Sequence, residues 1–200
     1  MKHLFLISLL FLSSSVFARQ ATYSPPLTRA VHLIYQFEES RKIITQVEKE
    51  GGVHIHVANL GKRGTNALWD PSNRTIVLNT SKPRTDGINV RSILFELHNA
   101  LSTKHFDYYG RLARERKISK WDYVEAIERI EHNNALHTVT LLNSGIQQNV
   151  FPQDARWNIA PSFEEHFALQ KQSGHSGFIA KNYDSMHKSF LNEPDFQAKT

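Results

Sequence analysis

Hydrophobic residues recur at helical spacing along most of the chain. From about residue 28 to residue 50 this spacing predicts one helix, ended by the pair Gly51–Gly52. The same period predicts helices at about residues 90–104 and 106–116, and a long one that runs from Ser119 to Gly145. Two shorter helices are expected, one from Ser162 onward and one between Phe178 and Leu191. Ser119 and Ser162, each with an acidic residue three positions later, are typical helix starts.

Strands are predicted in one region, between the first two helices. The segment Val53–Ala58 alternates apolar and polar residues and places His54 and His56 on its polar face. Residues 67–79 predict a hairpin, because the turn sequence Asp70–Asn73 has proline at its favoured second position. The order of helix, small strand region and then mostly helices favours an α+β fold, with a small antiparallel sheet packed on a mostly helical domain.

The N-terminus has the layout of a cleavable signal peptide. A short basic start is followed by the apolar run Leu4–Leu12 and by small residues that lead to Ala18. A membrane anchor would need about 18 or more consecutive apolar residues, roughly twice this run. We therefore expect residues 1–18 to be removed and the protein to be exported to the periplasm or secreted, with no transmembrane segment in the mature chain.

The remaining length fits one domain, which is about the usual size for a single core. We expect a leader at residues 19–26, a single α+β domain at 27–191 and a C-terminal tail at 192–200. The chain has no cysteine, which excludes disulfides, thiolate ligands and a cysteine nucleophile. Its net charge of +5 is dispersed, without the like-charge runs typical of nucleic-acid binding, so we do not expect a nucleic-acid partner.

A stretch of about 35 residues resembles the core of zincin-type metallopeptidases. It combines the turn Asp70–Asn73, the strand Thr75–Asn79 and a helix that contains Phe95–Glu96–Leu97–His98–Asn99. In zincins an edge strand of this type precedes the helix that carries His-Glu-x-x-His. The resemblance implies a zincin-like fold with a degenerate motif.

The departure from the zincin motif concerns the metal ligands. Two histidines four positions apart hold zinc in that motif, and the glutamate between them is the general base. Here Phe95 and Asn99 occupy the histidine positions, and Glu96 keeps the glutamate position. Because a catalytic zinc normally has three protein ligands, we expect no metal at this helix. Glu96 is the candidate catalytic residue, and Asn99 and Thr103 lie within about 60° of it on a helical wheel.

Several histidines are further candidates. His98 lies on another side of the same helix, and His175 lies in the glycine-containing segment Ser173–Gly177, which we expect to be a loop that could bring His175 to a cleft. This segment lacks the order of a nucleophile elbow. We name both histidines as candidate binding residues, beside Asn99 and Thr103.

Two other groups of residues have the spacing of metal ligands. One face of the long helix carries Glu125, Glu128 and His132, which could bind metal in a helical bundle or form a solvated face. His54 and His56 share a strand face, which permits chelation or an exposed polar edge.

Three functions stay open on this basis. The first is an exported zincin-like protein without zinc hydrolase activity, a secreted effector or periplasmic binding protein with an unidentified protein or peptide partner. The second is an active hydrolase with an unconventional site around Glu96 and histidines from elsewhere in the chain. The third is an unrelated envelope interaction protein. The sequence assigns no cofactor to any of them.

Overall fold

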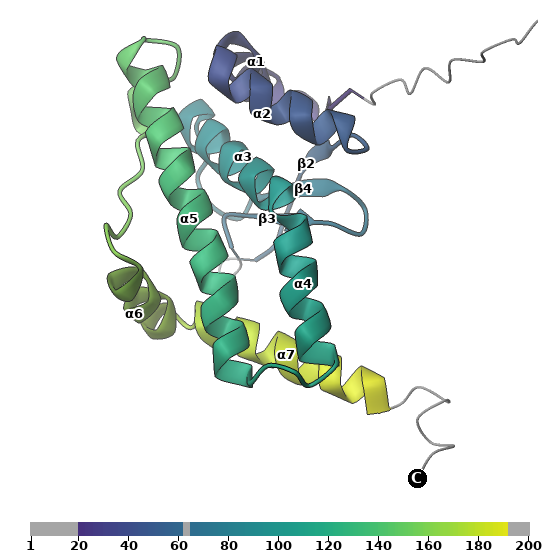
Figure 1. The fold of residues 1–200 in the computed structure, drawn as a ribbon. Coiled ribbons are helices and arrows are strands. Elements are labelled where there is room, and N and C mark those ends of the chain that lie inside the picture. Colours follow the sequence, from purple (N-terminus) through teal and green to yellow (C-terminus); the bar gives the residue numbers. More distant parts are fainter. Residues whose placement is uncertain (1–19, 62–64, 192–200) are drawn as a thin grey trace, which may run out of the picture.

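The computed structural model describes residues 20–61 and 65–191, which form helices around one small sheet (Figure 1). The expected signal peptide and C-terminal tail lie outside the described residues. The helices are α1 Thr28–Gln36, α2 Glu38–Lys49, α3 Asp86–Leu101, α4 Thr103–Arg114, α5 Lys120–Gln147, α6 Phe163–Ser173 and α7 His175–Leu191, with 3-10 turns η1 Pro25–Leu27 and η2 Gln153–Ala155. The strands are β1 Thr22–Tyr23, β2 His54–Ala58, β3 Ala67–Asp70 and β4 Thr75–Asn79.

The α+β class is confirmed, but the sheet is mixed and not antiparallel. Its order is β1-β2-β4-β3, in which β1, β2 and β4 run parallel and β3 alone is antiparallel. The hairpin is present as predicted, yet its second strand returns beside β2 in the same direction. Thr75–Asn79 is therefore an inner strand, and Ala67–Asp70 forms the edge, which corrects the edge position implied by the zincin resemblance.

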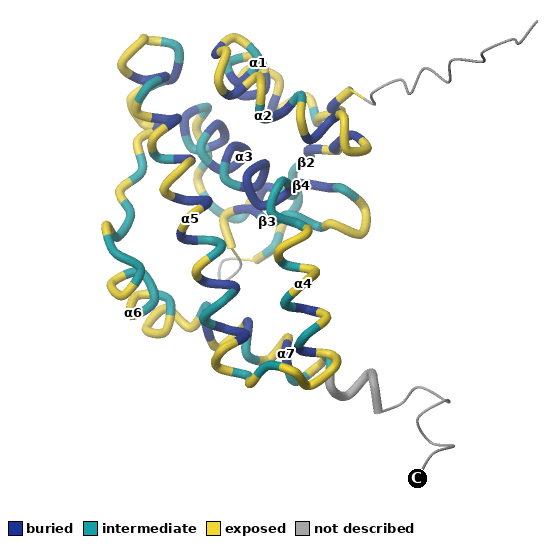
Figure 2. The backbone as a smooth tube through the Cα atoms, viewed as in Figure 1, coloured by how far each residue is buried: buried dark blue, intermediate teal, exposed yellow. Residues whose placement is uncertain are grey.

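Helix α3 lies at the centre of the main core. It packs against β3, β4, α1 and α2, and most of its length is buried (Figure 2). Ile55 and Ile76 on the sheet and Leu97 on α3 are fully buried in the same cluster. The helix begins at Asp86, earlier than expected, because the hydroxyl of Thr85 accepts the Ile88 backbone N–H and caps the first turn. Burial of this face holds α3 in a fixed position relative to the sheet.

The first predicted helix is two helices that meet at Phe37. This residue has φ −88° and ψ 120°, an extended conformation that interrupts the helix. Its ring is buried and packs edge-to-face against Phe151, with centroids 5.2 Å apart. Ser40 contacts the carbonyl oxygens of Ile34 and Phe37, at 2.6 and 3.0 Å, near the break. The hydrophobic period continues across the break, so periodicity did not reveal it.

The C-terminal helices form a second, smaller core at the end of the molecule away from α1 and α2 (Figure 1). Helices α4, α5 and α7 pack around Val124, Ile127 and Ile179, whereas α6 has no buried residue. The expected loop Ser173–Gly177 is wrong, because only Gly174, with φ 87°, separates α6 from α7. None of the helices in the described part is both long and apolar enough to cross a membrane.

Candidate metal centre

Two glutamates of α5 face the beginning of α7. Glu128 and Glu131 are three positions apart, so they lie on one side of the helix. His175 is the first residue of α7 and meets them there. One ligand atom from each of these three residues lies within 4.8 Å of the other two. We call Glu128, Glu131 and His175 the triad.

Glu128 is the buried centre of the triad. Its Oε1 atom accepts hydrogen bonds from Ser176 Oγ at 2.7 Å and from His175 Nδ1 at 3.1 Å. Its Oε2 atom is buried, has no hydrogen-bond partner among the described residues, and lies 3.4 Å from His166 Nε2. Burial by itself raises the pKa of Glu128, but the interactions with His166, His175 and Ser176 outweigh it and lower the pKa to about 2. Glu128 is therefore an anion, with Ser176 and His175 at one carboxylate oxygen and His166 near the other.

Glu131 and His175 connect the triad to solvent. Their side chains are 23% and 35% exposed, and His175 Nε2 lies 3.7 Å from Glu131 Oε2. Desolvation raises the pKa of Glu131, and the charge of Glu128 raises it further. The hydrogen bond to Glu128 raises the pKa of His175, against the effect of its burial. The imidazole thus lies between two carboxylates, with one ring nitrogen facing each.

This arrangement has two chemical uses. An imidazolium can bridge the two carboxylates as a structural ion pair. Alternatively, a neutral His175 and the two carboxylates can act as three protein ligands of a divalent ion, a number that leaves one position open in a tetrahedral site. The convergence of three ligand atoms within 4.8 Å favours the second use.

Glu96 lies on α3, at the end of a buried chain of hydrogen bonds. Its carboxylate accepts from Asn99 Nδ2 at 2.9 Å and from the Trp69 backbone. Asn99 Oδ1 in turn accepts from Asn134 Nδ2 at 2.9 Å, and Asn134 Oδ1 accepts from Ser102 Oγ at 3.0 Å. Asn99, which the helical wheel places beside Glu96, thus bonds the side chains of both Glu96 and Asn134.

Burial governs the chemistry of Glu96. The residue is only 4% exposed, and desolvation raises its pKa to about 8 although Asn99 donates to it. The charge of Glu131 raises this pKa further, whereas His175 lowers it. Glu96 lies on α3, and these two charges act on it from α5 and α7.

Two residues of the predicted α3 site have structural roles. Phe95 packs edge-to-face against Trp157, with ring centroids 5.3 Å apart. Thr103 accepts the Trp69 indole N–H at 3.0 Å and donates to Ala100 O at 2.7 Å. These contacts join α3 and α4 to their neighbours, and they place neither side chain in the triad.

His98 belongs to a different environment. Its Nδ1 lies 3.0 Å from Leu94 O and 2.9 Å from Thr138 Oγ1. The Thr138 hydroxyl donates to Asn134 O, so it accepts from His98, and the proton of the neutral ring is on Nδ1. Desolvation lowers the pKa of His98 to about 4, which keeps the imidazole neutral. Among the predicted site residues, Glu96 and Asn99 are hydrogen-bonded to each other, His175 belongs to the triad, and His98 contacts Thr138.

The predicted row on the long helix does not converge. Glu125 pairs with Arg129 at 2.8 Å in solvent, while His132 is buried and its Nε2 contacts Ala160 O at 3.1 Å. A solvated face describes Glu125 but is wrong for Glu128 and His132. Sequence reasoning missed the contributions of Glu131, His166 and Ser176; the spacing of Glu128 and Glu131 is the only local signal that could have found one of them.

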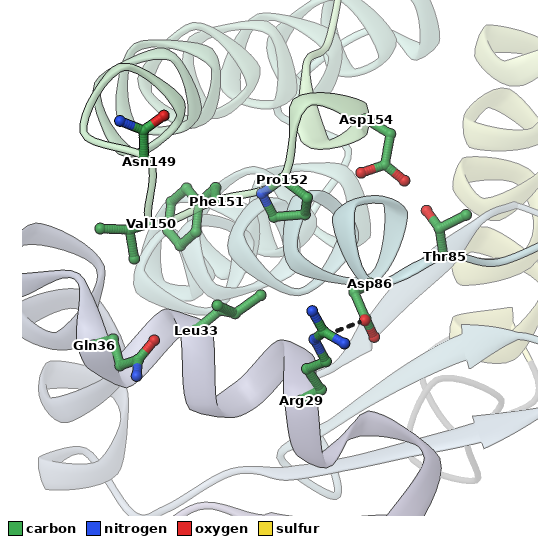
Figure 3. Close-up of a pocket in the computed structure, with 10 residues that line it drawn as sticks. All are labelled: Arg29, Leu33, Gln36, Thr85, Asp86, Asn149, Val150, Phe151, Pro152 and Asp154. Carbon is green, nitrogen blue, oxygen red and sulfur yellow. Dashed lines mark ion pairs between the residues drawn. The ribbon is translucent and has the colours of Figure 1, made fainter.

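A groove lies elsewhere, between α1 and the segment 149–154 (Figure 3). Its volume is about 780 Å³, and Leu33 and Phe151 line its apolar part. Arg29 and Asp86 form an ion pair at 3.1 Å at one end. The groove shares no residue with the triad.

Comparison of the chain with known protein families, with curated proteins and with solved structures finds no match. The zincin resemblance of Asp70–Asn79 and Phe95–Asn99 therefore stays a prediction. Function must be argued from the geometry and chemistry of the site itself.

Proposed function

We propose that the mature chain is an exported, zincin-like binding protein that holds a divalent transition metal between Glu128, Glu131 and His175. The observation that carries this proposal is the convergence of one ligand atom from each of these residues within 4.8 Å, at the buried carboxylate of Glu128. A divalent ion with a neutral His175 would balance the two carboxylate charges.

The donor set indicates the class of metal. Imidazole suits zinc, copper, iron and nickel, whereas magnesium and calcium take oxygen ligands. His166 and Ser176 contact the carboxylate of Glu128, so they would orient this ligand. A zinc-like ion with one open position is therefore the expected occupant.

The residues of α3 favour a binding role over conventional zinc peptidase activity. Phe95 carries no ligand atom and packs on Trp157, and Asn99 is engaged by Glu96 and Asn134. The metal would be held by α5 and α7 and not by the helix that carries the degenerate motif. Export to the periplasm or beyond, and a protein or peptide partner, remain parts of the proposal that rest on the sequence.

The test is metal affinity in matched variants of the untagged mature protein. Glu131→Gln and His175→Gln should each weaken Zn²⁺ binding by about tenfold or more in competition with a chromophoric chelator. Glu125→Gln is the control, since this residue lies on the same helix but pairs with Arg129 in solvent. Equal zinc affinity in all four proteins would contradict the proposal, as would a wild type without affinity for zinc.

A second function, a metal-dependent hydrolase, is favoured by the position of Glu96. The charges of Glu131 and His175 act on the pKa of Glu96, and we infer that this carboxyl could lie close enough to the metal to accept a proton from bound water. The test is turnover of peptide and ester substrates by wild type and Glu96→Gln at equal zinc loading. Activity that is lost in Glu96→Gln while zinc affinity is retained supports a hydrolase. Rates in both proteins that do not exceed the uncatalysed rate support the binding role alone, and equal rates above it would exclude Glu96 as the base.

A further inference from the structure

The outer face of the sheet carries two imidazoles that are separate from the triad. Residues of a strand alternate between its two faces, so His54 and His56 point away from Ile55, which is buried under α3. Their ring centroids are 5.2 Å apart and their planes differ by 31°. His54 is exposed and His56 is half-buried. The pair is therefore preformed on the surface side of β2.

The neighbouring strand orients one of the two rings. His54 Nδ1 lies 2.6 Å from Thr22 Oγ1 on β1, which pairs with β2 in parallel register. When the ring donates this hydrogen bond, Nε2 keeps its lone pair. Metal-binding histidines are usually fixed in this way, with the second ring nitrogen bonded to a protein acceptor. Thr22 thus prepares His54 to be a ligand.

The second ring has an unsatisfied nitrogen. His56 Nδ1 is buried and has no hydrogen-bond partner among the residues that the structure describes. A buried polar atom in this state destabilises the folded protein unless another group bonds to it. The cost can be offset by a bound ion or water. This orphaned atom is a second observation, independent of the ring spacing, that points to a ligand.

The spacing of the rings fits one shared ion. A metal–nitrogen bond is about 2.0–2.1 Å long, so the ring centroid lies about 3.1 Å from the metal. Two imidazoles at a tetrahedral angle then have centroids about 5 Å apart. We propose that His54 and His56 bind an imidazole-preferring transition-metal ion of the Cu²⁺, Ni²⁺ or Zn²⁺ class, with its other positions open to water or to a donor from another molecule.

Cu²⁺ is the probe that tests this site, because nitrogen ligands are counted directly in its electron paramagnetic resonance spectrum. The measurement uses untagged mature protein with the Glu131→Gln change, so that the triad contributes little. We expect a spectrum with two imidazole nitrogens. His54→Asn or His56→Asn should each weaken Cu²⁺ binding about tenfold or more, and the double variant should lose the two-nitrogen signal.

Two controls sharpen the result. His105→Asn removes an exposed histidine of α4 and should leave Cu²⁺ affinity unchanged. Thr22→Val removes the oxygen that orients His54 and should weaken binding while both imidazoles remain in the spectrum. Persistence of the two-nitrogen signal in the double variant would overturn the proposal, and so would the absence of such a signal in the parent protein. The triad is tested separately by Zn²⁺ in the double variant, so either site can fail alone.

Discussion

The wild type should lose stability as pH rises from about 4.5 to 8, and replacement of Glu96 by glutamine should remove this loss. Desolvation raises the pKa of the folded carboxyl to about 8, from its ordinary value of 4.5. Between these values the folded state binds a proton that the unfolded state has lost. The stabilising contribution of Glu96 is therefore complete below about pH 4.5, and it is lost as pH rises through 8.

The size of the effect follows from this difference in pKa. One pKa unit corresponds to about 1.4 kcal/mol, so wild type should lose roughly 3–5 kcal/mol relative to Glu96→Gln between pH 4.5 and 8.5. Glutamine stays neutral, but it replaces one acceptor oxygen by a donor near Asn99 and the Trp69 backbone. At pH 5 the variant should therefore be less stable by about 1 kcal/mol or less, and above pH 7 it should be the more stable protein.

Urea denaturation at several pH values, with a chelator present, measures this difference directly. Glu96→Ala is the companion variant: it leaves the amide of Asn99 without its acceptor and should cost about 1–3 kcal/mol at pH 5. Parallel stability curves of wild type and Glu96→Gln from pH 5 to 9 would refute the reasoning. Equal stability of all three proteins would place Glu96 in solvent, since surface changes usually stay within about 0.5 kcal/mol.

Three further predictions concern other parts of the chain. Burial lowers the pKa of His98 to about 4, so the free energy of unfolding should fall by up to about 1.4 kcal/mol per pH unit as pH drops from about 6.5 towards 4. Acid denaturation of His98→Asn should show a flatter slope in this range. Gly145→Ala should lower the free energy of unfolding in urea by about 1–3 kcal/mol, because the added Cβ would collide with the Phe151 ring. Gly177→Ala is the control, since its Cβ would meet open space, and equal effects of the two changes would contradict this packing. Mass spectrometry of the exported protein should find Arg19 at the N-terminus, whereas recovery of the full-length chain from membranes would contradict cleavage.

Several elements could be predicted because their signals are local. Ser119 and Ser162 accept the backbone N–H groups of Asp122 and Glu165, each at 3.2 Å, as expected for helix starts. The turn at Asp70–Asn73 also joins two antiparallel strands as predicted. Each of these signals acts between residues a few positions apart, so the sequence is sufficient to predict it.

Only part of the candidate site could be predicted from local signals of this kind. The motif and the glycine-containing segment identified Glu96, Asn99 and His175 as candidates, but they did not identify the residues that these side chains contact. Helical spacing indicated that Glu128 shares a face with Glu125, yet the two residues have opposite environments. A helical wheel gives the direction of a side chain and not the element that covers it.

The sequence by itself determined the α+β class, the capped helix starts, the hairpin and the absence of cysteine chemistry. Only the tertiary structure decided that β4 pairs in parallel with β2, that the first helix breaks at Phe37, and that His175 meets Glu128 across 47 positions of the chain. Contacts at that separation depend on how α5 and α7 pack, because burial of their apolar faces fixes the relative position of the two helices. The pKa values of Glu96, Glu128 and His98 follow from the same packing, since desolvation and the hydrogen-bond partners exist only after the helices have assembled.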